Sequence, residues 1–480
     1  MSDQEQYKSP DVPLYVSLDG ALIKSDIDFE LFFALLARSF TFLFLAPIWL
    51  LKGKANFKQQ IALRTDLDPA LLPYNQKFLR YLREQKKSGR TIILITAANK
   101  IYAQKIANHL DLFDEVLASD EQSILYDDRK AASIQSKQGT HEFDYVGNAQ
   151  TDKNTWRYAR KIVLANPTPA IKTVASPDFE LERIFDDRIP AVTAVFRAMR
   201  PHQWLKNILL FVTLLASHRI DSPQLVAQAI LGFIVFCFCT SSVYLLNDLI
   251  DLQSDRTHQR KRFRPLAAGQ LSIQLGTILI PVLLLVAITL ASFLPSSFLS
   301  ILAGYYLLTL LYSLWLKRVV LLDVLILAIL YTFRIVAGGA AVEITPSFWL
   351  LTFSMFIFFS LAMIKRYTEL VTLNSTSKHS TAGRDYDVMD ADFLMSIGTS
   401  SGLVAVLVLA LYINSNDVIQ MYSHPQVIWL LCPVIFYWIG RVWLLAKRGK
   451  MHDDPLIFAI KDPASWWAGA IAVGILFLAT

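Results

Sequence analysis

The sequence predicts two kinds of fold in one chain: a soluble, Rossmann-like α/β domain, followed by an all-α, multi-pass membrane bundle. From about residue 14 to residue 166, short apolar segments alternate with amphipathic ones, which is typical of a doubly wound parallel sheet. From about residue 205 onwards, long apolar runs follow one another. Hydrophobic residues make up 54% of the 480 residues and charged residues 18%, which is too apolar for a soluble protein. We therefore expect an α/β domain over 1–166, a linker over 167–194 and a membrane domain over 195–480.

Charge and cysteine content exclude several classes of function. The net charge of +6 is modest and lies mostly in loops, so no nucleic-acid partner is needed to explain it. Cys237, Cys239 and Cys432 all lie in apolar runs, which predicts buried thiols, with neither a disulfide framework nor a metal site. The polar N-terminus has no signal peptide, so we expect residue 1 to stay in the cytoplasm. The sequence leaves a homo-oligomer open.

The expected strands of the α/β domain bring three polar residues to one edge. Strands are predicted at 14–18, 91–96, 143–147 and 162–165, with helices at 74–87 and about 152–161. Asp19, Thr96 and Asn148 each fall at or just beyond the end of a strand. Ligands bind outside the carboxyl ends of parallel strands, so this edge is a candidate site.

The segment Ser17-Leu-Asp19-Gly-Ala-Leu resembles the first motif, D-x-D-G-T-L, of the haloacid dehalogenase (HAD) phosphatase superfamily. The resemblance implies a HAD-like fold, with Asp19 in the acid/base position and Thr96 as the phosphate-binding hydroxyl. It also implies that Lys130 is the motif lysine, and that the last acidic motif runs from Gly147 to Asp152 with Asn148 in place of a metal-binding aspartate.

The family's nucleophile and Mg²⁺ ligand is an aspartate, and this chain has Ser17 there. A serine cannot readily replace a carboxylate that attacks phosphorus while it touches a metal. We therefore expect a vestigial site without phosphatase activity; the rival hypothesis is an active phosphatase. The nearby pair Asp26 and Asp28 has acidic spacing but no strand before it, so we discount it as the motif.

An apolar run over residues 31–51 is interrupted by Arg38 and Pro47. Its length would allow a span, but a single crossing would put strands 14–18 and 91–96 of one sheet on opposite sides of a bilayer. We therefore predict an interfacial helix or hairpin in the cap region, and favour membrane contact over a buried cap helix. Residues 167–194 contain four prolines among charges and read as a linker.

Apolar runs in the second part predict about nine membrane spans. They lie at about 205–219, 224–246, 272–293, 297–316, 319–340, 347–364, 393–413, 426–446 and 463–480. Almost all Lys and Arg of the loops follow even-numbered spans, whereas Arg219 alone follows an odd-numbered one. The positive-inside rule then places the even loops in the cytoplasm, on the side of the α/β domain, and predicts a protein of the cell inner membrane.

An acidic stretch directly follows the second span. At helical spacing, Asn247, Asp248, Asp251 and Asp255 lie within roughly one 100° face. Carboxylates this close repel one another unless a hard cation lies among them, and Mg²⁺ binds through a few carboxylates and substrate phosphates. The basic block that follows, from Arg256 to Arg264, suits the rest of a phosphorylated substrate.

The pattern N-D-x-x-D-x-x-x-D at this position resembles the UbiA superfamily of intramembrane prenyltransferases, over about residues 195–480. The resemblance implies that two acidic loops hold Mg²⁺ and a diphosphate. Three further motifs, R-P-x-Q-W-x-K-N, R-x-x-x-R-K-R-x-R-P and K-R-Y-x-E-L, resemble its polyprenyl-phosphate phosphoribosyltransferase branch, typified by the decaprenyl-phosphate enzymes. In the second acidic loop, Asp385, Asp387, Asp390 and Asp392 lack the D-x-x-x-D spacing of the aromatic-prenylating branches, which favours the phosphoribosyl interpretation.

This resemblance implies Mg²⁺-dependent transfer of 5-phosphoribosyl from phosphoribosyl diphosphate to a polyprenyl phosphate. Asn247, Asp251 and Asp255 would bind the metal, and Asp248, Asp251 and Asp255 would be the catalytic acids, with the role of Asp248 between ribose and metal left open. The expected substrate-binding residues are Lys206, Asn207, His258, Lys261, Arg262, Arg264, Tyr312, Lys317, Lys365, Arg366 and Arg384. Two ionisable residues of the fifth span, Asp323 and Arg334, are expected to be paired or functional.

Two other functions remain open from sequence. A prenyltransferase that moves a polyprenyl group from its diphosphate to an aromatic or small polar acceptor would use the same acids. A non-catalytic membrane scaffold or lipid carrier would use none of them.

Overall fold

The computed structural model describes residues 12–120, 124–140, 142–149, 152–168, 171, 180–374, 385–415, 418, 422–451 and 454–480. The chain divides into two compact units. The first comprises Met1–Met199 and Tyr244–Pro281, and the second comprises Arg200–Val243 and Val282–Thr480. The acidic stretch after the second expected span therefore belongs to the same unit as the α/β domain.

The first unit is built on a six-stranded, fully parallel sheet with the order β3-β2-β1-β4-β5-β6. Its strands are β1 (Leu14–Ser17), β2 (Ile92–Asn99), β3 (Glu115–Ser119), β4 (Asp144–Gly147), β5 (Ile162–Ala165) and β6 (Leu181–Phe185). The strand order reverses between β1 and β4, and the carboxyl ends of these two strands frame the crevice where such sheets bind ligands. The predicted doubly wound α/β fold is confirmed.

The linker prediction for residues 167–194 is wrong at Leu181–Phe185, because these residues form the edge strand β6, paired with β5. Only the two ends of β6 are partly covered, and Glu182 and Arg183 are exposed. An edge strand with charged outward residues resembles a loop in its composition. The prediction also missed β3.

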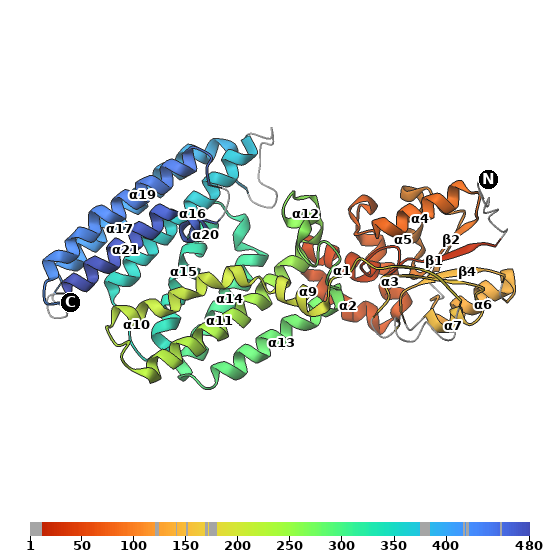
Figure 1. Ribbon diagram of the computed structural model, residues 1–480, viewed down its shortest axis with the longest axis horizontal. Coiled ribbons are helices and arrows are strands. Elements are labelled where there is room, and N and C mark those ends of the chain that lie inside the picture. Colours follow the sequence, from red (N-terminus) through yellow and green to blue (C-terminus); the bar gives the residue numbers. More distant parts are fainter. Residues whose placement is uncertain are drawn as a thin grey trace, which may run out of the picture. The chain divides into compact units, whose positions relative to one another are not determined.

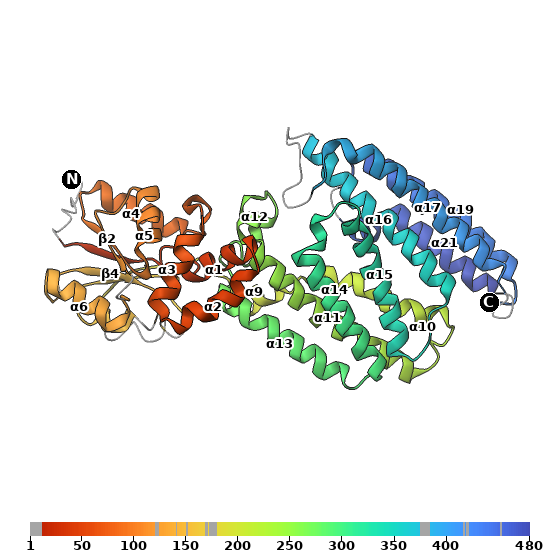
Figure 2. The ribbon, with the colours of Figure 1, turned by 180° about the vertical axis from the view of Figure 1, so that it is seen from behind.

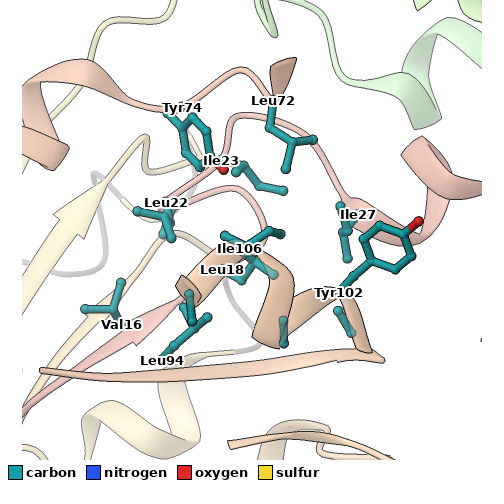
Figure 3. Packing of buried hydrophobic residues seen from close by; sticks show 14 of the residues in the cluster. Val16, Leu18, Leu22, Ile23, Ile27, Leu72, Tyr74, Leu94, Tyr102 and Ile106 are labelled. Carbon is teal, nitrogen blue, oxygen red and sulfur yellow. The ribbon is translucent and has the colours of Figure 1, made fainter. Parts of the chain in front are cut away.

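Helices lie on both faces of the sheet (Figure 1). Alternating side chains of the strands pack on these two helical layers. One layer contains α4 (Gln76–Lys87) and α5 (Lys100–Leu110), which cover Val16 and Leu94. Figure 3 shows this core, where Leu22, Ile23 and Ile27 fill the space above the end of β1. The other layer contains α6 (Asp127–Gln138) and α7 (Lys153–Trp156), which is shorter than the helix expected at 152–161.

The apolar run over 31–51 does not form one helix. It is divided between α1 (Ile27–Arg38) and α2 (Thr41–Leu51), and α3 (Lys54–Arg64) follows. The break lies at Ser39, whose φ of −158° and ψ of 131° are extended. Helix α1 buries its apolar face in the sheet's core, whereas α2 leaves large side chains such as Phe44 and Leu51 exposed. The predicted hairpin therefore agrees with the fold, and its membrane contact stays a prediction.

The remainder of the first unit comprises short elements and the ends of two long helices. The short elements are η1 (Pro69–Leu71), α9 (Ala191–Ala198), α12 (Leu252–Thr257) and η4 (Lys261–Phe263). The long helices are α11 (Pro223–Ile250) and α13 (Ile273–Ala291), and each also extends into the second unit.

The second unit is all-helical (Figure 2). Its further elements are η3 (Pro201–Phe211), α10 (Val212–Ala216), α14 (Ser296–Leu314), η5 (Leu316–Arg318), α15 (Leu322–Ala341), α16 (Phe348–Asn374), η6 (Val388–Asp390), α17 (Ala391–Ile413), η7 (Pro425–Leu430), α19 (Leu431–Lys447), α20 (Pro455–Lys461) and α21 (Pro463–Ala479). The three cysteines are free and buried, as predicted.

Within the described part of the chain, seven helical segments are long and apolar enough to cross a membrane, which makes this a multi-pass membrane protein. The predicted nine was approximate. The segment expected to span at 205–219 consists of η3 and α10. Its apolar part is too short for a full span, because only residues 208–216 lie between the polar Asn207 and Ser217. The last expected span is α21, an apolar helix of 17 residues.

Candidate active site

The acidic stretch keeps its helical spacing, as the sequence predicted. The amide of Asp251 donates to the carbonyl of Asn247 at 2.9 Å, and the amide of Asp255 donates to the carbonyl of Asp251 at 2.8 Å. Asp251 ends the regular part of α11 and caps α12, with φ of −91° and ψ of 12°. The four polar residues therefore follow one helical path through a slight distortion.

Two of these acids converge on one guanidinium. Arg264 Nη1 lies 3.1 Å from Asp248 Oδ1 and 2.5 Å from Asp255 Oδ2. Both carboxylates are 2% exposed, whereas Arg264 is 26% exposed. Burial raises the pKa of Asp255, and the charge of Arg264 opposes that shift. Asn247 and Asp251 are half-buried beside this pair.

The donor set fits Mg²⁺. Two buried carboxylates, which offer the hard oxygen ligands that Mg²⁺ prefers, already contact the guanidinium of Arg264. Mg²⁺ needs only one or two protein carboxylates when phosphates complete its coordination shell. No group of three or more His, Cys, Asp and Glu suited to a metal occurs among the residues that the structure describes. The assignment of Asn247, Asp251 and Asp255 as the metal ligands stays a prediction, and so does the role of Asp248 towards ribose or metal.

The basic block after α12 does not act as one cluster. Arg256 turns away from the acids and pairs with Glu30 of α1. Lys261 and Arg262 are exposed on η4, where the Arg262 guanidinium lies 4.8 Å from the Phe263 ring centroid. His258 is also exposed, and its Nδ1 accepts from the amides of Arg260 and Lys261. Partial desolvation and the neighbouring Lys261 lower the pKa of His258.

In the second unit, two expected substrate-binding lysines meet at one acid. Lys206 Nζ lies 2.8 Å and Lys365 Nζ 3.5 Å from Asp454 Oδ2. Asp454 was not predicted; the only sequence signal is its place directly before Pro455, where α20 begins. Among the residues that the structure describes, these two ammonium groups share the Asp454 carboxylate, and ammonium groups are suited to phosphate binding.

Arg366 is enclosed by protein. Its guanidinium is 1% exposed and contacts Asp323, Glu369 and the hydroxyl of Tyr312. The hydroxyl of Tyr386 donates to the other oxygen of Asp323 at 2.6 Å. This network favours a structural role for Arg366 and Tyr312 over the predicted contact with substrate, because it occupies both ends of the guanidinium.

Asn207 is likewise buried. Its side-chain oxygen accepts from Arg334 Nε at 3.0 Å, and Arg334 Nη2 donates to the hydroxyl of Tyr305 at 2.7 Å. Asp323 and Arg334 are thus both paired, though not with each other. Lys317 is half-buried on η5, and Arg384 lies outside the described residues.

The HAD-like site lies at the predicted edge of the sheet, in a cavity of about 450 Å³. Ser17 ends β1 and Asp19 follows it. Asp19 Oδ1 accepts from the amide of Ile27 at 2.9 Å, and its Oδ2 accepts from Thr96 Oγ1 at 3.0 Å. Burial raises the pKa of Asp19, and the charge of Lys130, which lines the same cavity, partly offsets the shift.

The far side of this cavity carries Asn148 and Asp152. The carboxylate of Asp152 accepts from the amide of Asn148 at 3.0 Å and from the hydroxyl of Tyr145 at 3.0 Å, so it holds the loop after β4. Gly20 has φ of +73°, and a Cβ there would lie 1.9 Å from Asn148 Nδ2. The predicted residues Ser17, Asp19, Lys130, Asn148 and Asp152 all line the cavity, and Thr96 holds Asp19.

The discounted pair Asp26 and Asp28 lines the same cavity, which sequence reasoning missed. Asp26 caps α1, and Asp28 pairs with Lys58 at 2.8 Å. Burial raises the pKa of Asp26 to about 7 and that of Asp28 to about 6. The cavity therefore holds several acids but lacks the carboxylate that Ser17 replaces.

A HAD-like domain joined to a polytopic helical bundle, with a buried acidic motif after a membrane helix, defines a membrane-embedded transferase. Comparison with protein families agrees, since the model of the UbiA prenyltransferase family matches residues 208–467 and that of haloacid dehalogenase-like hydrolases matches residues 17–152. The chain belongs to the UbiA prenyltransferase family.

The chain is similar to three curated relatives over most of their length. The uncharacterized protein y4nM of Sinorhizobium fredii is 33% identical over 471 residues, which cover 98% of this chain and 91% of that protein. Nodulation protein NoeC of Azorhizobium caulinodans is 37% identical over 61% of this chain and 94% of its own length. Decaprenyl-phosphate phosphoribosyltransferase of Mycolicibacterium smegmatis is 28% identical over 60% of this chain and 93% of its own length.

Proposed function

We propose that this protein transfers 5-phosphoribosyl from phosphoribosyl diphosphate to a polyprenyl phosphate and releases diphosphate, with Mg²⁺ as cofactor. The observation that carries the proposal is the buried acidic pair Asp248 and Asp255 at the end of a membrane helix. The similarity to a decaprenyl-phosphate phosphoribosyltransferase over nearly that enzyme's whole length supports this choice of substrates.

The acidic residues would hold the cation, and the basic residues the phosphates. Bound Mg²⁺ would neutralise charge on the leaving diphosphate. The Mg²⁺ ion would be coordinated by side-chain oxygens of Asp248 and Asp255, with Asn247 and Asp251. Arg264 already bridges the two buried acids, and its partly exposed guanidinium is placed to donate to a phosphate as well.

Lys206 and Lys365 are proposed as further phosphate ligands, because each keeps donors beyond those directed at Asp454. In the reaction, the bond from ribose C1 to the diphosphate oxygen breaks, and a bond from C1 to an oxygen of the polyprenyl phosphate forms. The attacking phosphate is already anionic, so no side chain has to remove a proton. Charge stabilisation of the leaving group is then the main catalytic contribution.

We place the reaction at the cytoplasmic face of the inner membrane, with the HAD-like domain in the cytoplasm. The bias of Lys and Arg towards the even-numbered loops supports this orientation. The polyprenyl tail would lie among the apolar helices. The resulting ribosylated lipid would suit a later step of cell-envelope synthesis.

For the HAD-like domain we propose that phosphatase activity is absent. Ser17 supplies no carboxylate to attack phosphorus. Both carboxylate oxygens of Asp152 accept hydrogen bonds, one from the amide of Asn148 and one from the hydroxyl of Tyr145. Purified full-length protein should release no inorganic phosphate from p-nitrophenyl phosphate or ribose 5-phosphate. Phosphate release that Asp19→Asn abolishes would refute this part of the proposal.

The transferase is tested with purified protein in lipid nanodiscs, Mg²⁺, polyprenyl phosphate and radiolabelled phosphoribosyl diphosphate. The expected result is a labelled lipid, with equimolar diphosphate release, that disappears in Asp251→Asn. Turnover of a polyprenyl diphosphate with an aromatic acceptor, and no labelled lipid, would establish the prenyltransferase instead. Unchanged cellular function in Asp251→Asn would favour the scaffold or carrier.

A further inference from the structure

A buried ion pair joins the HAD-like domain to the acidic motif inside the first unit. Arg256 Nη1 and Nη2 donate to the two carboxylate oxygens of Glu30 at 2.9 and 2.6 Å. The side chain of Glu30 is 0% exposed and that of Arg256 5% exposed. Arg256 Nε also donates to the carbonyl of Ala267 at 3.0 Å, so each of the three guanidinium nitrogens has a hydrogen-bond partner.

Two other contacts seat the segment after the motif on the same part of the HAD-like domain. Gly269 has φ of +67°, and a Cβ there would lie 2.6 Å from Lys24 Cβ and 3.2 Å from Pro73 Cβ. Gln274 Nε2 donates to Asp26 Oδ2 at 3.2 Å. The contacts at Arg256, Gly269 and Gln274 thus fall on the segment between β1 and α1, on α1 itself and on Pro73 before α4.

The ion pair lies one residue from a proposed metal ligand. Successive residues of a helix point about 100° apart, so α12 directs Asp255 to Arg264 and Arg256 to Glu30. A buried, bidentate ion pair restrains the rotation of a helix more strictly than apolar packing does, because both of its hydrogen bonds form in one orientation only. Helix α12 is only six residues long, so the ion pair at Arg256 adds to the few contacts that its buried residues Leu252 and Asp255 make.

We infer that Glu30 of the HAD-like domain is a positioning residue for the transferase: through Arg256 it sets the orientation of α12 and hence the place of the Asp255 carboxylate. The inference rests on the proposed function for the role of Asp255. This role of the HAD-like domain does not need the nucleophile that Ser17 replaces. The position of Glu30 depends only on the fold that holds α1 in place.

The test uses Glu30→Gln in the full-length protein in nanodiscs, with Glu84→Gln on the exposed face of α4 as the matched control. We expect Glu30→Gln to raise the Mg²⁺ concentration for half-maximal diphosphate release about tenfold, as loss of an outer-shell partner commonly does. The rate at saturating Mg²⁺ should change much less. Glu84→Gln should behave as wild type. Wild-type Mg²⁺ dependence in Glu30→Gln would overturn the inference.

A second measurement separates this inference from the proposed reaction. Hydrogen exchange of the amides of residues 252–257 should be faster in Glu30→Gln than in wild type, whatever the enzyme transfers. If wild type makes no ribosylated lipid but this difference appears, the proposed function fails and the positioning contact stands. Equal exchange in both proteins would refute the contact.

A lone buried Arg256 in Glu30→Gln can prevent folding, so the double variant Glu30→Gln/Arg256→Gln carries the same test without an unpaired charge. We expect it to show the raised Mg²⁺ requirement while its elution profile in size-exclusion chromatography matches that of wild type. Its effect should equal that of either single variant that folds, because the two residues act as one unit. A double variant with the Mg²⁺ requirement of wild type would overturn the inference.

Discussion

Arg264 joins the two buried acids of the motif, so Arg264→Met tests the assigned site directly. The variant removes the charge that lies 3.1 Å from Asp248 and 2.5 Å from Asp255. Opposite unit charges about 4 Å apart, at an effective dielectric constant of about 20, attract each other by about 4 kcal/mol. Because Arg264 is 26% exposed, solvent screening reduces this to about 2 kcal/mol.

The sign follows from the protonation of Asp255. Burial raises its pKa and Arg264 lowers it, so loss of Arg264 raises the pKa further. Metal binding needs the carboxylate, which in the variant forms only at higher pH. We expect the acidic limb of the rate profile to move to higher pH. Diphosphate release is measured in nanodiscs from about pH 5 to about pH 9.

The matched control is Arg262→Met, which removes an exposed arginine two residues away. Its pH profile should follow that of wild type. If the profiles of Arg264→Met and wild type coincide, Arg264 does not govern the charge of Asp255, and the reasoning fails.

Three further predictions concern other parts of the chain. Asp251→Asn should lower the transfer rate about 100-fold at unchanged protein yield, measured as labelled lipid; a rate near wild type would exclude Asp251 from the site. Burial raises the folded-state pKa of Asp26 to about 7, so the folded state keeps a proton that the unfolded state loses. The stability that is present near pH 4 is therefore lost as the pH rises through about 7. The Tm of Asp26→Asn should therefore fall less than that of wild type between about pH 5 and about pH 8, and equal slopes would contradict the burial of that charge. A fluorophore on Phe44→Cys, which replaces a ring that is 76% exposed on α2, should be quenched by spin-labelled lipid in nanodiscs, whereas one on Glu84→Cys should not; equal quenching would refute membrane contact by α2.

Local patterns were sufficient for much of this fold. Apolar runs predicted β1, β2, β4 and β5, and the spacing of the acids predicted a helical path from Asn247 to Asp255. Local patterns failed where burial is one-sided. Strand β6 carries charges because it lies at the sheet's edge, and η3 with α10 fills the place of a full span because its apolar part is short.

The convergence of side chains was less predictable than the backbone. The sequence identified the acids, but Asp248 and Asp255 form the buried pair because Arg264 folds back onto them. Lys206 and Lys365 meet at Asp454, which is 248 residues from the first of them. Contacts at such separations leave no periodic signal in one sequence, since each partner has only its local neighbours to mark it.

Two arginines of the basic block contact acids in different surroundings. Arg264 bridges Asp248 and Asp255 and stays partly exposed, whereas Arg256, one residue from Asp255, is removed from solvent by Glu30. A basic block that served only to attract phosphate would gain nothing from burying one of its charges, because desolvating an arginine and a glutamate is costly. Burial is consistent instead with selection for a fixed geometry. On this view the HAD-like domain contributes to the transferase through the orientation of α12, and loss of the family's nucleophile at Ser17 leaves that contribution intact.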